Sequence, residues 1–251
     1  MEKTILITGA TAGFGRACAE FFADKGWKLV LTGRRTERLE ELADRLGRER
    51  THIVCFDVRD RRAVEQAIDG LPDGFARIDV LVNNAGLALG MSKAHEADLD
   101  DWETMVDTNI KGLLYMTRKL LPSMVLRNAG HIVNVGSVAG DHAYPGVNIY
   151  GASKAFVSLF SDGLKADVLG TAVRVTNIEP GLAETEFSKV RFKGDESKAD
   201  AVYQGLQPLA ARDIAEAIYW AVDRPAHVNI NRIELMPICQ SCGPFLLHRD
   251  G

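Results

Sequence analysis

One serine, one tyrosine and one lysine stand at a spacing that suits proton transfer at a substrate oxygen. Tyr150 and Lys154 belong to the stretch Tyr-Gly-Ala-Ser-Lys, so a helix there puts both side chains on one face. A tyrosine hydroxyl has an ordinary pKa of about 10 and is a poor base near neutrality. A neighbouring ammonium lowers that pKa, so we expect Tyr150 to act as a general acid or base. The upstream hydroxyl of Ser137 suits a hydrogen bond to the same substrate oxygen.

A glycine-rich turn near the N-terminus indicates what Ser137, Tyr150 and Lys154 could act with. The first apolar run leads directly into TGATAGFG, residues 8–15, and a helical pattern follows. Such a turn lets backbone N–H groups approach a pyrophosphate, although glycines alone also fit a tight turn packed for its own sake. Its position after the first strand favours nucleotide binding, and a nicotinamide ring on that nucleotide would supply or accept the hydride. The cofactor residues predicted here are Gly9, Thr11, Gly13, Phe14 and Gly15.

Two arginines at the end of the second apolar run indicate which cofactor is bound. Arg34 and Arg35 stand where this type of fold often places a carboxylate for the ribose hydroxyls of NAD. Guanidinium groups suit a 2′-phosphate instead, so we predict NADP(H). The plainer alternative is a solvated basic patch that opens the next helix, which also carries Arg38.

Polar and small residues after the third and fourth apolar runs extend the predicted cofactor site. Asp57 ends the third run, where its carboxylate would accept from the adenine amino group or simply cap the next helix. Asn83 and the three residues after it end the fourth run, where they would close the ribose side, tie neighbouring strands together or form a polar turn. The residues predicted to bind the cofactor here are Asp57, Val58, Asn84, Ala85 and Gly86.

Seven short apolar runs, separated by stretches of helical period, must hold these residues in place. The runs are rich in Ile, Val and Leu without strict alternation, which is typical of strands covered on both faces of a parallel sheet. They cover residues 4–8, 27–32, 51–56, 78–82, 131–135, 173–178 and 228–235. Strand–helix alternation predicts an α/β fold with a doubly wound, Rossmann-type sheet. Asp100 with Glu103 is typical of a capping box for a helix that begins near Trp102.

The composition fits a single domain over residues 1–251. Hydrophobic residues make up 46% and charged residues 25%, which are ordinary globular values. The net charge of −4 gives no support to a nucleic-acid or anionic-membrane surface. No apolar stretch is long enough to cross a bilayer and no signal-peptide pattern opens the chain, so we expect a cytoplasmic protein.

The least regular stretch, residues 182–209, is rich in charge and glycine and predicts a mobile substrate loop. Among its cations Lys189, Arg191 and Lys193, we favour Arg191 for a substrate carboxylate because a guanidinium binds it in bidentate fashion. The alternative is that all three are solvated charges. His142 and Tyr144 lie between the serine and the tyrosine and should border the substrate pocket, although an ordinary loop histidine explains His142 equally well.

The four cysteines predict thiols rather than a metal centre. Cys18 and Cys55 sit inside apolar patterns and are predicted to be buried. Cys239 and Cys242 form a lone C-x-x-C, short of the four or so ligands of a zinc site, so we predict structural or surface thiols and no metal. The apolar tail 245–247 is predicted to pack on a neighbouring subunit.

Together these motifs resemble the short-chain dehydrogenase/reductase family in its short, non-extended type, and the resemblance covers nearly the whole chain. It implies a seven-stranded parallel sheet, with Tyr150 as general acid/base, Lys154 lowering its pKa and binding the nicotinamide ribose, and Ser137 orienting the substrate oxygen. It also implies that Asn109 holds a proton-relay water near the lysine. From the residues alone, an asparagine within a helix is only a mild hint of a special role, and a solvent-facing side chain is the alternative. The resemblance adds as contacts of the cofactor's carboxamide end Pro180, Gly181, Leu182 and Thr185.

Within the family, segments outside the catalytic motifs are similar to bacterial NADP-dependent 3-hydroxy acid dehydrogenases. These segments are residues 83–90, 101–105, 186–195 and 225–231. The similarity implies a homotetramer that interconverts serine, allo-threonine or 3-hydroxypropionate with 3-oxo acids or semialdehydes. A sulfonate semialdehyde such as sulfoacetaldehyde, a plain ketone or a 3-oxoacyl thioester suits the same centre. A non-catalytic NADPH-binding protein is a different class, against which the complete Ser–Tyr–Lys set argues.

Overall fold

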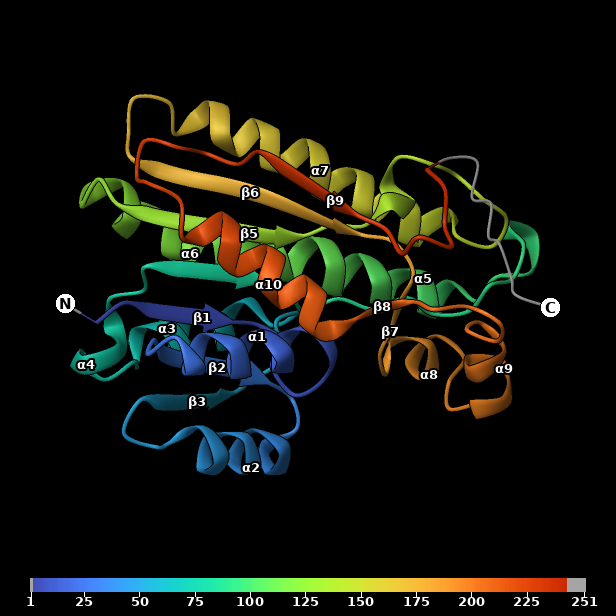
Figure 1. Cartoon of the computed structure of the whole chain (residues 1–251), viewed down its shortest axis with the longest axis horizontal. Coiled ribbons are helices and arrows are strands. Elements are labelled where there is room, and N and C mark those ends of the chain that lie inside the picture. Colours follow the sequence, from blue (N-terminus) through green and yellow to red (C-terminus); the bar gives the residue numbers. More distant parts are fainter. Residues whose placement is uncertain (1, 243–251) are drawn as a thin grey trace.

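The computed structural model describes residues 2–242 and contains the predicted seven-stranded sheet. Its strands are β1 (Thr4–Ile7), β2 (Lys28–Gly33), β3 (Thr51–Cys55), β4 (Val80–Asn83), β5 (Gly130–Val135), β6 (Val173–Pro180) and β9 (Arg232–Leu235). Their order is β3-β2-β1-β4-β5-β6-β9, and every neighbouring pair is parallel (Figure 1). The chain winds outward from β1 in one direction and from β4 in the other, so the sheet is doubly wound and has its switch point between these strands.

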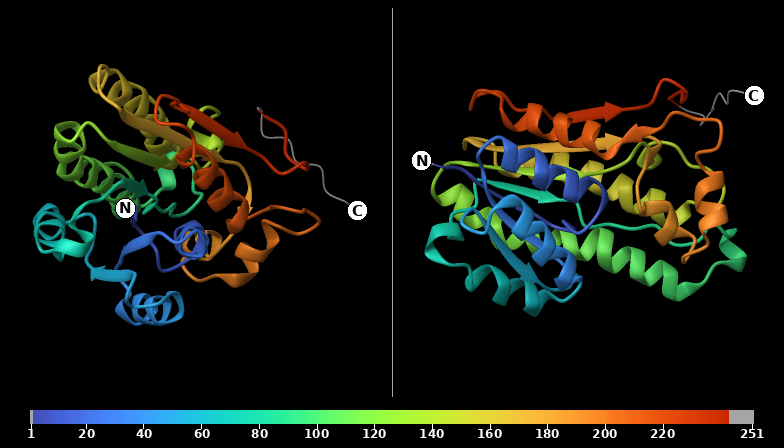
Figure 2. Two further views of the ribbon diagram at one scale, coloured as in Figure 1. Left: turned by 60° about the vertical axis from the view of Figure 1, so that its left-hand side comes forward. Right: turned by 60° about the horizontal axis from the view of Figure 1, so that its bottom comes forward.

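Helices cover both faces of the sheet (Figures 1 and 2). One face packs against α1 (Gly13–Asp24), α2 (Thr36–Leu46) and α10 (Ala211–Val222). The other face packs against α3 (Arg61–Asp69), α6 (Leu113–Leu126) and α7 (Asn148–Asp167). Shorter helices are α4 (Asp73–Ala76), α5 (Leu99–Val106), α8 (Phe187–Arg191) and α9 (Glu196–Ala201). No helix among the described residues is long and apolar enough to cross a membrane.

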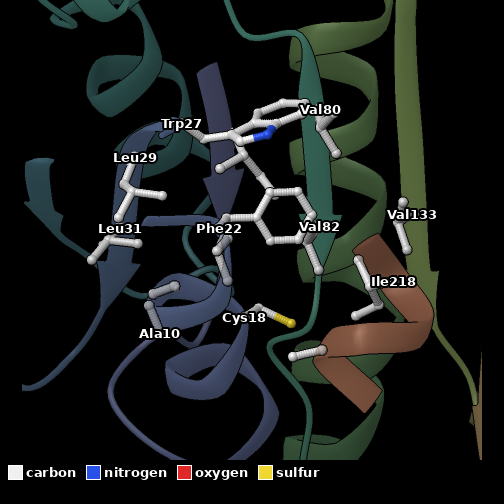
Figure 3. Packing of buried hydrophobic residues seen from close by; sticks show 14 of the residues in the cluster. Ala10, Cys18, Phe22, Trp27, Leu29, Leu31, Val80, Val82, Val133 and Ile218 are labelled. Carbon is white, nitrogen blue, oxygen red and sulfur yellow. The ribbon is translucent and has the colours of Figure 1, made fainter. Parts of the chain in front are cut away.

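The core beneath α1 shows why these apolar residues form a covered parallel sheet. Phe22 of α1 is fully buried and meets the ring of Trp27 edge-on, with ring centroids 5.2 Å apart (Figure 3). Val82 of β4 and Ile218 of α10 belong to the same cluster (Figure 3). Burial of such side chains contributes about 1.5–3 kcal/mol each, which fixes α1 and the turn before it on the sheet.

A buried amide ladder ties together the strands whose ends carry polar residues. The Asn83 side chain donates to Asn134 Oδ1 at 2.9 Å and to Thr117 Oγ1 at 3.0 Å. Asn134 in turn donates to Ser161 Oγ of α7 at 2.9 Å. The prediction that amide residues after the fourth run tie neighbouring strands together is confirmed for Asn83, and the ladder fixes α7 relative to β4 and β5.

Three local expectations are wrong. The N-cap of α5 is Asp98, whose carboxylate accepts from the backbone N–H of Asp100, so Asp100 itself lies inside the helix. Cys55 is exposed because it ends β3, the edge strand, whereas Cys18 is buried as expected. Residues 182–209 hold α8, α9 and a two-stranded parallel sheet of β7 (Ala183–Glu184) and β8 (Leu209–Ala210), and are thus more regular than a loop.

The cysteines of the described part are all free thiols. Cys239 is partly exposed, with its sulfur 3.5 Å from the carbonyl oxygen of Gln207, and Cys242 is exposed. This placement agrees with the prediction of structural or surface thiols. The predicted apolar tail at 245–247 lies outside the described residues.

Candidate active site

A cavity of about 650 Å³ runs along the carboxyl ends of the strands and brings the predicted motifs together. Parallel α/β sheets bind ligands at this edge. The predicted cofactor residues in its wall are Gly9, Thr11, Gly13, Phe14, Arg34, Arg35, Asp57, Val58, Asn84, Ala85, Gly86, Tyr150, Lys154, Pro180, Gly181, Leu182 and Thr185. Ser137, Tyr144 and Arg191 also line it. His142 does not line this cavity or the smaller one beside it, so its predicted substrate role has no support from this geometry.

The glycine turn leaves room for phosphate oxygens at the start of α1. Gly9 and Gly13 have φ angles of 68° and 51°, which side-chain-bearing residues rarely adopt. The N-cap of α1 is Ala12, whose methyl side chain cannot accept hydrogen bonds from the first N–H groups of the helix. Unsatisfied N–H groups and the helix dipole suit a pyrophosphate, so the turn fits the cofactor expected there.

Gly15 supports this turn from behind instead of lining the cavity. Its neighbour Asn84 donates from Nδ2 to the carbonyl oxygens of Thr8 and Gly9, at 2.8 and 3.2 Å, and so ties the end of β4 to the turn. A Cβ on Gly15 would lie 2.6 Å from that same Nδ2. The third glycine therefore serves the packing of the turn against β4.

We expect Gly15→Ala to destabilise the fold by about 1–3 kcal/mol, as overpacking of a close contact does, and to weaken NADPH binding because the turn must shift. Thermal unfolding and a nucleotide fluorescence titration measure the two effects. Gly163→Ala is the matched control, since a Cβ there meets nothing within 4 Å on helix α7, and we expect a gain of about 1 kcal/mol. Equal melting temperatures for the two variants would contradict this assignment.

Arginines from the end of β2 and the start of α2 stand at one end of the cavity. Arg35 donates to Thr11 Oγ1 from Nε at 3.1 Å and from Nη2 at 2.7 Å, which fixes its guanidinium against the glycine turn. Arg34 Nη1 lies 3.8 Å from a carboxylate oxygen of Asp57. Asp57 is not the cap of α3, because Asp60 accepts from the first N–H groups of that helix. The rim thus offers fixed cations to a 2′-phosphate.

The sequence analysis missed Glu186, which meets these arginines from the opposite side. Its carboxylate lies 3.1 Å from Arg35 Nη1 and 2.7 Å from Arg38 Nη1. Burial acts to raise the pKa of Glu186, but the hydrogen bonds from Arg38 and Arg35 outweigh it and the pKa falls. No local pattern reveals the contact, since about 150 residues separate the partners.

Ser137, Tyr150 and Lys154 meet where β5 and the first turns of α7 adjoin the cavity. The Ser137 hydroxyl hydrogen-bonds the Tyr150 side chain and accepts from the Ala139 N–H at 3.1 Å. Lys154 is buried and donates from Nζ to the carbonyl oxygen of Val135 at 2.7 Å. Its Nζ lies 5.8 Å from the centroid of the Tyr150 ring. The helical i, i+4 placement of tyrosine and lysine is therefore confirmed.

Burial sets the protonation of this pair. Desolvation raises the pKa of Tyr150 to about 12, against the opposing charge of Arg191 and the hydrogen bond with Ser137. Desolvation also lowers the pKa of Lys154 to about 8. The sequence predicts that Lys154 lowers the pKa of Tyr150, and the structure shows the opposite shift. The loss of water around the phenol raises this pKa by more than the nearby positive charge lowers it. At neutral pH Tyr150 carries its proton.

Asn109 lies in a π-helical segment, Asp107–Gly112, between α5 and α6. Its side chain is buried, donates to the carbonyl oxygen of Leu87 at 2.8 Å and to Ser153 Oγ at 3.0 Å, and accepts from the Leu87 N–H at 2.9 Å. The alternative of a solvent-facing asparagine is therefore wrong. Asn109 joins the loop after β4 to the helix that carries the lysine, and π-helical turns often occur at functional sites.

A second cavity of about 220 Å³ adjoins the tyrosine and shares two wall residues with the larger one, Tyr150 and Arg191. The guanidinium carbon of Arg191 lies 5.3 Å from the Tyr150 ring centroid and 5.1 Å from that of Phe187. Its buried Nε has no hydrogen-bond partner among the described residues. The other two candidate cations are paired, since Lys189 binds Glu196 and Lys193 binds Asp101, each at 2.8 Å.

Further wall residues escaped the sequence analysis because they only become neighbours on folding. Phe187 packs on Tyr150 with ring centroids 5.5 Å apart. Tyr203 donates to the carbonyl oxygen of Ala183 at 3.1 Å and so ties the turn after α9 to β7. The missed residues that line the larger cavity include Leu87, Met91, Thr108, Glu186, Phe187, Tyr203 and Gln240.

Comparisons with known proteins agree with this geometry. The family model described as short chain dehydrogenase matches residues 3–196. The chain is 56% identical to the NADP-dependent 3-hydroxy acid dehydrogenase YdfG of Escherichia coli, over 98% of this chain and 99% of that protein. It is 54% identical to the sulfoacetaldehyde reductase 2 of Chromohalobacter salexigens, over the whole of both chains. A solved closed form of serine dehydrogenase complexed with NADP⁺ superposes with a TM-score of 0.95 at 55% identity, covering 98% of this chain and 100% of that one.

Proposed function

This chain belongs to the short-chain dehydrogenase family, and we propose that it is an NADP(H)-dependent oxidoreductase that interconverts small 3-hydroxy acids with their 3-oxo acids or semialdehydes. Its substrates are of the serine, allo-threonine and 3-hydroxypropionate type. The observation that carries the proposal is the guanidinium of Arg191, which lies 5.3 Å from the ring of the proton-carrying Tyr150 and in the same cavity. A cation beside the proton donor suits a small substrate that has both a reacting oxygen and an anionic end.

The residues of this chain have separate roles in the proposed reaction. Tyr150 donates its proton to the carbonyl oxygen in reduction and accepts it from the hydroxyl in oxidation. Ser137 hydrogen-bonds the same oxygen, and Lys154 holds the ribose next to the nicotinamide. When bound, the nicotinamide ring supplies or accepts the hydride. Because burial raises the Tyr150 pKa to about 12, the hydroxyl carries the proton that it donates to the carbonyl oxygen. Asn109 holds a water of the proton path.

A sulfonate semialdehyde such as sulfoacetaldehyde is the second candidate substrate. The relative from Chromohalobacter salexigens bears that activity in its name and is 54% identical over the full length. A guanidinium binds a sulfonate as well as a carboxylate, so Arg191 serves both substrates. A plain ketone would leave the buried Nε of Arg191 without a partner, which disfavours this substrate.

An absorbance assay of NADP⁺ reduction tests the proposal. L-serine, L-allo-threonine, 3-hydroxypropionate and isethionate run in parallel, each with NADP⁺ and with NAD⁺. We expect turnover of the hydroxy acids with NADP⁺. Turnover of isethionate alone would move the substrate to a sulfonate, and no turnover with any small alcohol would favour a non-catalytic NADPH-binding protein.

We expect Arg191→Leu to raise the KM of a 3-hydroxy acid about 100-fold, because a charge-assisted pair with the substrate anion is lost. The KM of a neutral alcohol of similar size should change little. Steady-state kinetics with both substrates measure the difference. The control is Lys189→Leu on the same helix, whose ammonium pairs with Glu196, and it should leave both KM values near those of the parent. A similar loss with the neutral alcohol would show that Arg191 only supports the fold.

We further propose that the chain forms a homotetramer and works in the cytoplasm. Exposed apolar side chains on the helices, such as Leu159 of α7 and Trp220 of α10, support an assembly of copies. Light scattering of the full chain gives the oligomeric state.

A further inference from the structure

Residues 186–193, which we call the substrate strap, span the site from the cofactor arginines to the substrate cavity. The strap contains α8 and lies at the carboxyl edge of the sheet, at the end opposite the N-terminus (Figure 1). Its first residues follow Thr185, whose side chain lies beside Gly13 of the glycine turn, where a Cβ would meet it at 3.4 Å. In its middle, Phe187 and Arg191 pack on Tyr150. The strap is thus the part of the chain that touches both ends of the site.

The far end of the strap is fixed on α5 and the loop before it. The N–H of Gly90 donates to the carbonyl oxygen of Arg191 at 2.9 Å. Lys193 pairs with Asp101 at 2.8 Å and with Asp98 at 3.7 Å. These contacts hold Arg191 over the smaller cavity from the side of α5.

The near end of the strap is fixed by Glu186, the one acidic residue in the sequence of the strap. Its carboxylate bridges two guanidiniums, with Arg38 Nη1 at 2.7 and 2.9 Å from its two oxygens and Arg35 Nη1 at 3.1 Å from one. Arg35 is itself fixed by two hydrogen bonds to Thr11. Arg34 has one ion pair in the described part, at 3.8 Å to Asp57, and is therefore available to a phosphate.

We propose that Glu186 is a positioning residue that couples occupation of the 2′-phosphate site to closure of the substrate strap. This inference rests on the proposed function. A 2′-phosphate bound by Arg34 and Arg35 fixes the arginines that hold Glu186, and the strap then holds Phe187 and Arg191 on the tyrosine. The cofactor's phosphate thereby tightens substrate binding, although it lies at the opposite end of the site.

The charges of the cluster favour coupling over competition between Glu186 and the phosphate. Arg34, Arg35 and Arg38 carry three positive charges, and the carboxylate of Glu186 neutralises one of them. The nearby Asp57 is balanced by Arg59, whose guanidinium lies 2.6 Å from it. A phosphate ester carries a charge of about −1.5 to −2 at pH 7, which matches the remainder. Glu186 and the phosphate therefore bind the same cluster together.

The test compares Glu186→Gln with Arg38→Gln and with the double variant. We expect each single variant to raise the KM of a 3-hydroxy acid about tenfold at saturating NADP⁺, within the usual range of coupling between sites. Because neither residue transfers a proton, kcat should stay within about threefold of the parent. For Glu186→Gln, the Kd of NADPH, from nucleotide fluorescence without substrate, should also stay within about threefold. The double variant should be no worse than the poorer single one. The control Glu65→Gln, an exposed acid of α3 that pairs with Arg61, should change none of these values.

A second measurement needs no substrate and so separates this proposal from the proposed function. Hydrogen exchange of residues 186–193 should slow when NADP⁺ is added to the parent chain and remain unchanged with NAD⁺. In Glu186→Gln, the effect of NADP⁺ should be lost. Tenfold tighter NADPH binding by Glu186→Gln, with unchanged KM, would show that the acid competes with the phosphate and would overturn the coupling. The coupling would also be overturned if NADP⁺ and NAD⁺ slowed the hydrogen exchange of residues 186–193 equally. It would be overturned as well if the KM increases of Glu186→Gln and Arg38→Gln multiplied in the double variant.

Discussion

Tyr150→Phe should lower kcat about 1,000-fold and leave the Kd of NADPH unchanged. Proton transfer by a positioned side chain contributes about 10² to 10⁴ in rate, and the variant loses the hydroxyl that performs it. The ring remains, so its packing against Phe187 is kept. Steady-state kinetics and a nucleotide fluorescence titration on the same preparation measure both quantities.

Tyr219→Phe is the matched control. This tyrosine of α10 packs its ring on Phe21 at a centroid distance of 5.4 Å, away from the cavity, so loss of its hydroxyl should leave kcat unchanged. A Tyr150→Phe variant that retains a tenth or more of the parent activity would mean that another group moves the proton. Joint loss of activity and NADPH binding would point to a packing role of the ring.

Replacement of Arg34 and Arg35 by glutamine should change the cofactor preference. Each hydrogen bond to a charged group contributes about 1.5–3 kcal/mol, so loss of both guanidiniums should raise the KM of NADP⁺ about 100-fold or more. NAD⁺ has no 2′-phosphate, and its kcat/KM should change far less. The measurement is kcat/KM for both cofactors at two salt concentrations, since the phosphate contribution weakens with salt.

Arg61→Gln controls for the change in net charge. Its guanidinium pairs with Glu65 on the outer face of α3, and it should leave both cofactors unaffected. The single variant Arg34→Gln separates the loss of phosphate binding from any displacement of the strap, because Arg34 makes no contact with Glu186 in the described structure. If the variant that lacks both Arg34 and Arg35 lost NADP⁺ and NAD⁺ activity in equal measure, these arginines would stabilise the fold and would not bind the phosphate.

The sheet and the cofactor side of the site were predictable because their signals are local. A glycine turn, a pair of arginines and a tyrosine four residues before a lysine each lie within a few positions of one another. The alternation of apolar runs and helical stretches then puts these short motifs at one edge of the sheet. Consequently, the predicted residues from Gly9 to Thr185 line one cavity, except Gly15 and Asn109, which lie behind its wall, and His142, which lies outside it.

What the sequence could not provide depends on tertiary neighbours. Glu186 meets Arg35 and Arg38 across about 150 residues, and no spacing rule links them. Helices α8 and α9 have five and six residues, too few for a helical period to stand out. The raised pKa of Tyr150 reflects how much water the fold removes, which the i, i+4 spacing to Lys154 does not reveal.

The buried Lys154 also has a consequence for the stability of the folded chain. An unfolded lysine keeps its proton up to its ordinary pKa of about 10.4, whereas burial lowers the folded value to about 8. Below pH 8 the folded chain must keep a charged ammonium out of water, and this cost disappears as the pH rises towards the unfolded value. Tyr150 has the opposite sign, since a pKa raised to about 12 destabilises the folded state only above pH 10. At neutral pH the buried ammonium of Lys154 therefore lowers the free energy of unfolding, and selection for heat resistance alone would favour replacement of this lysine.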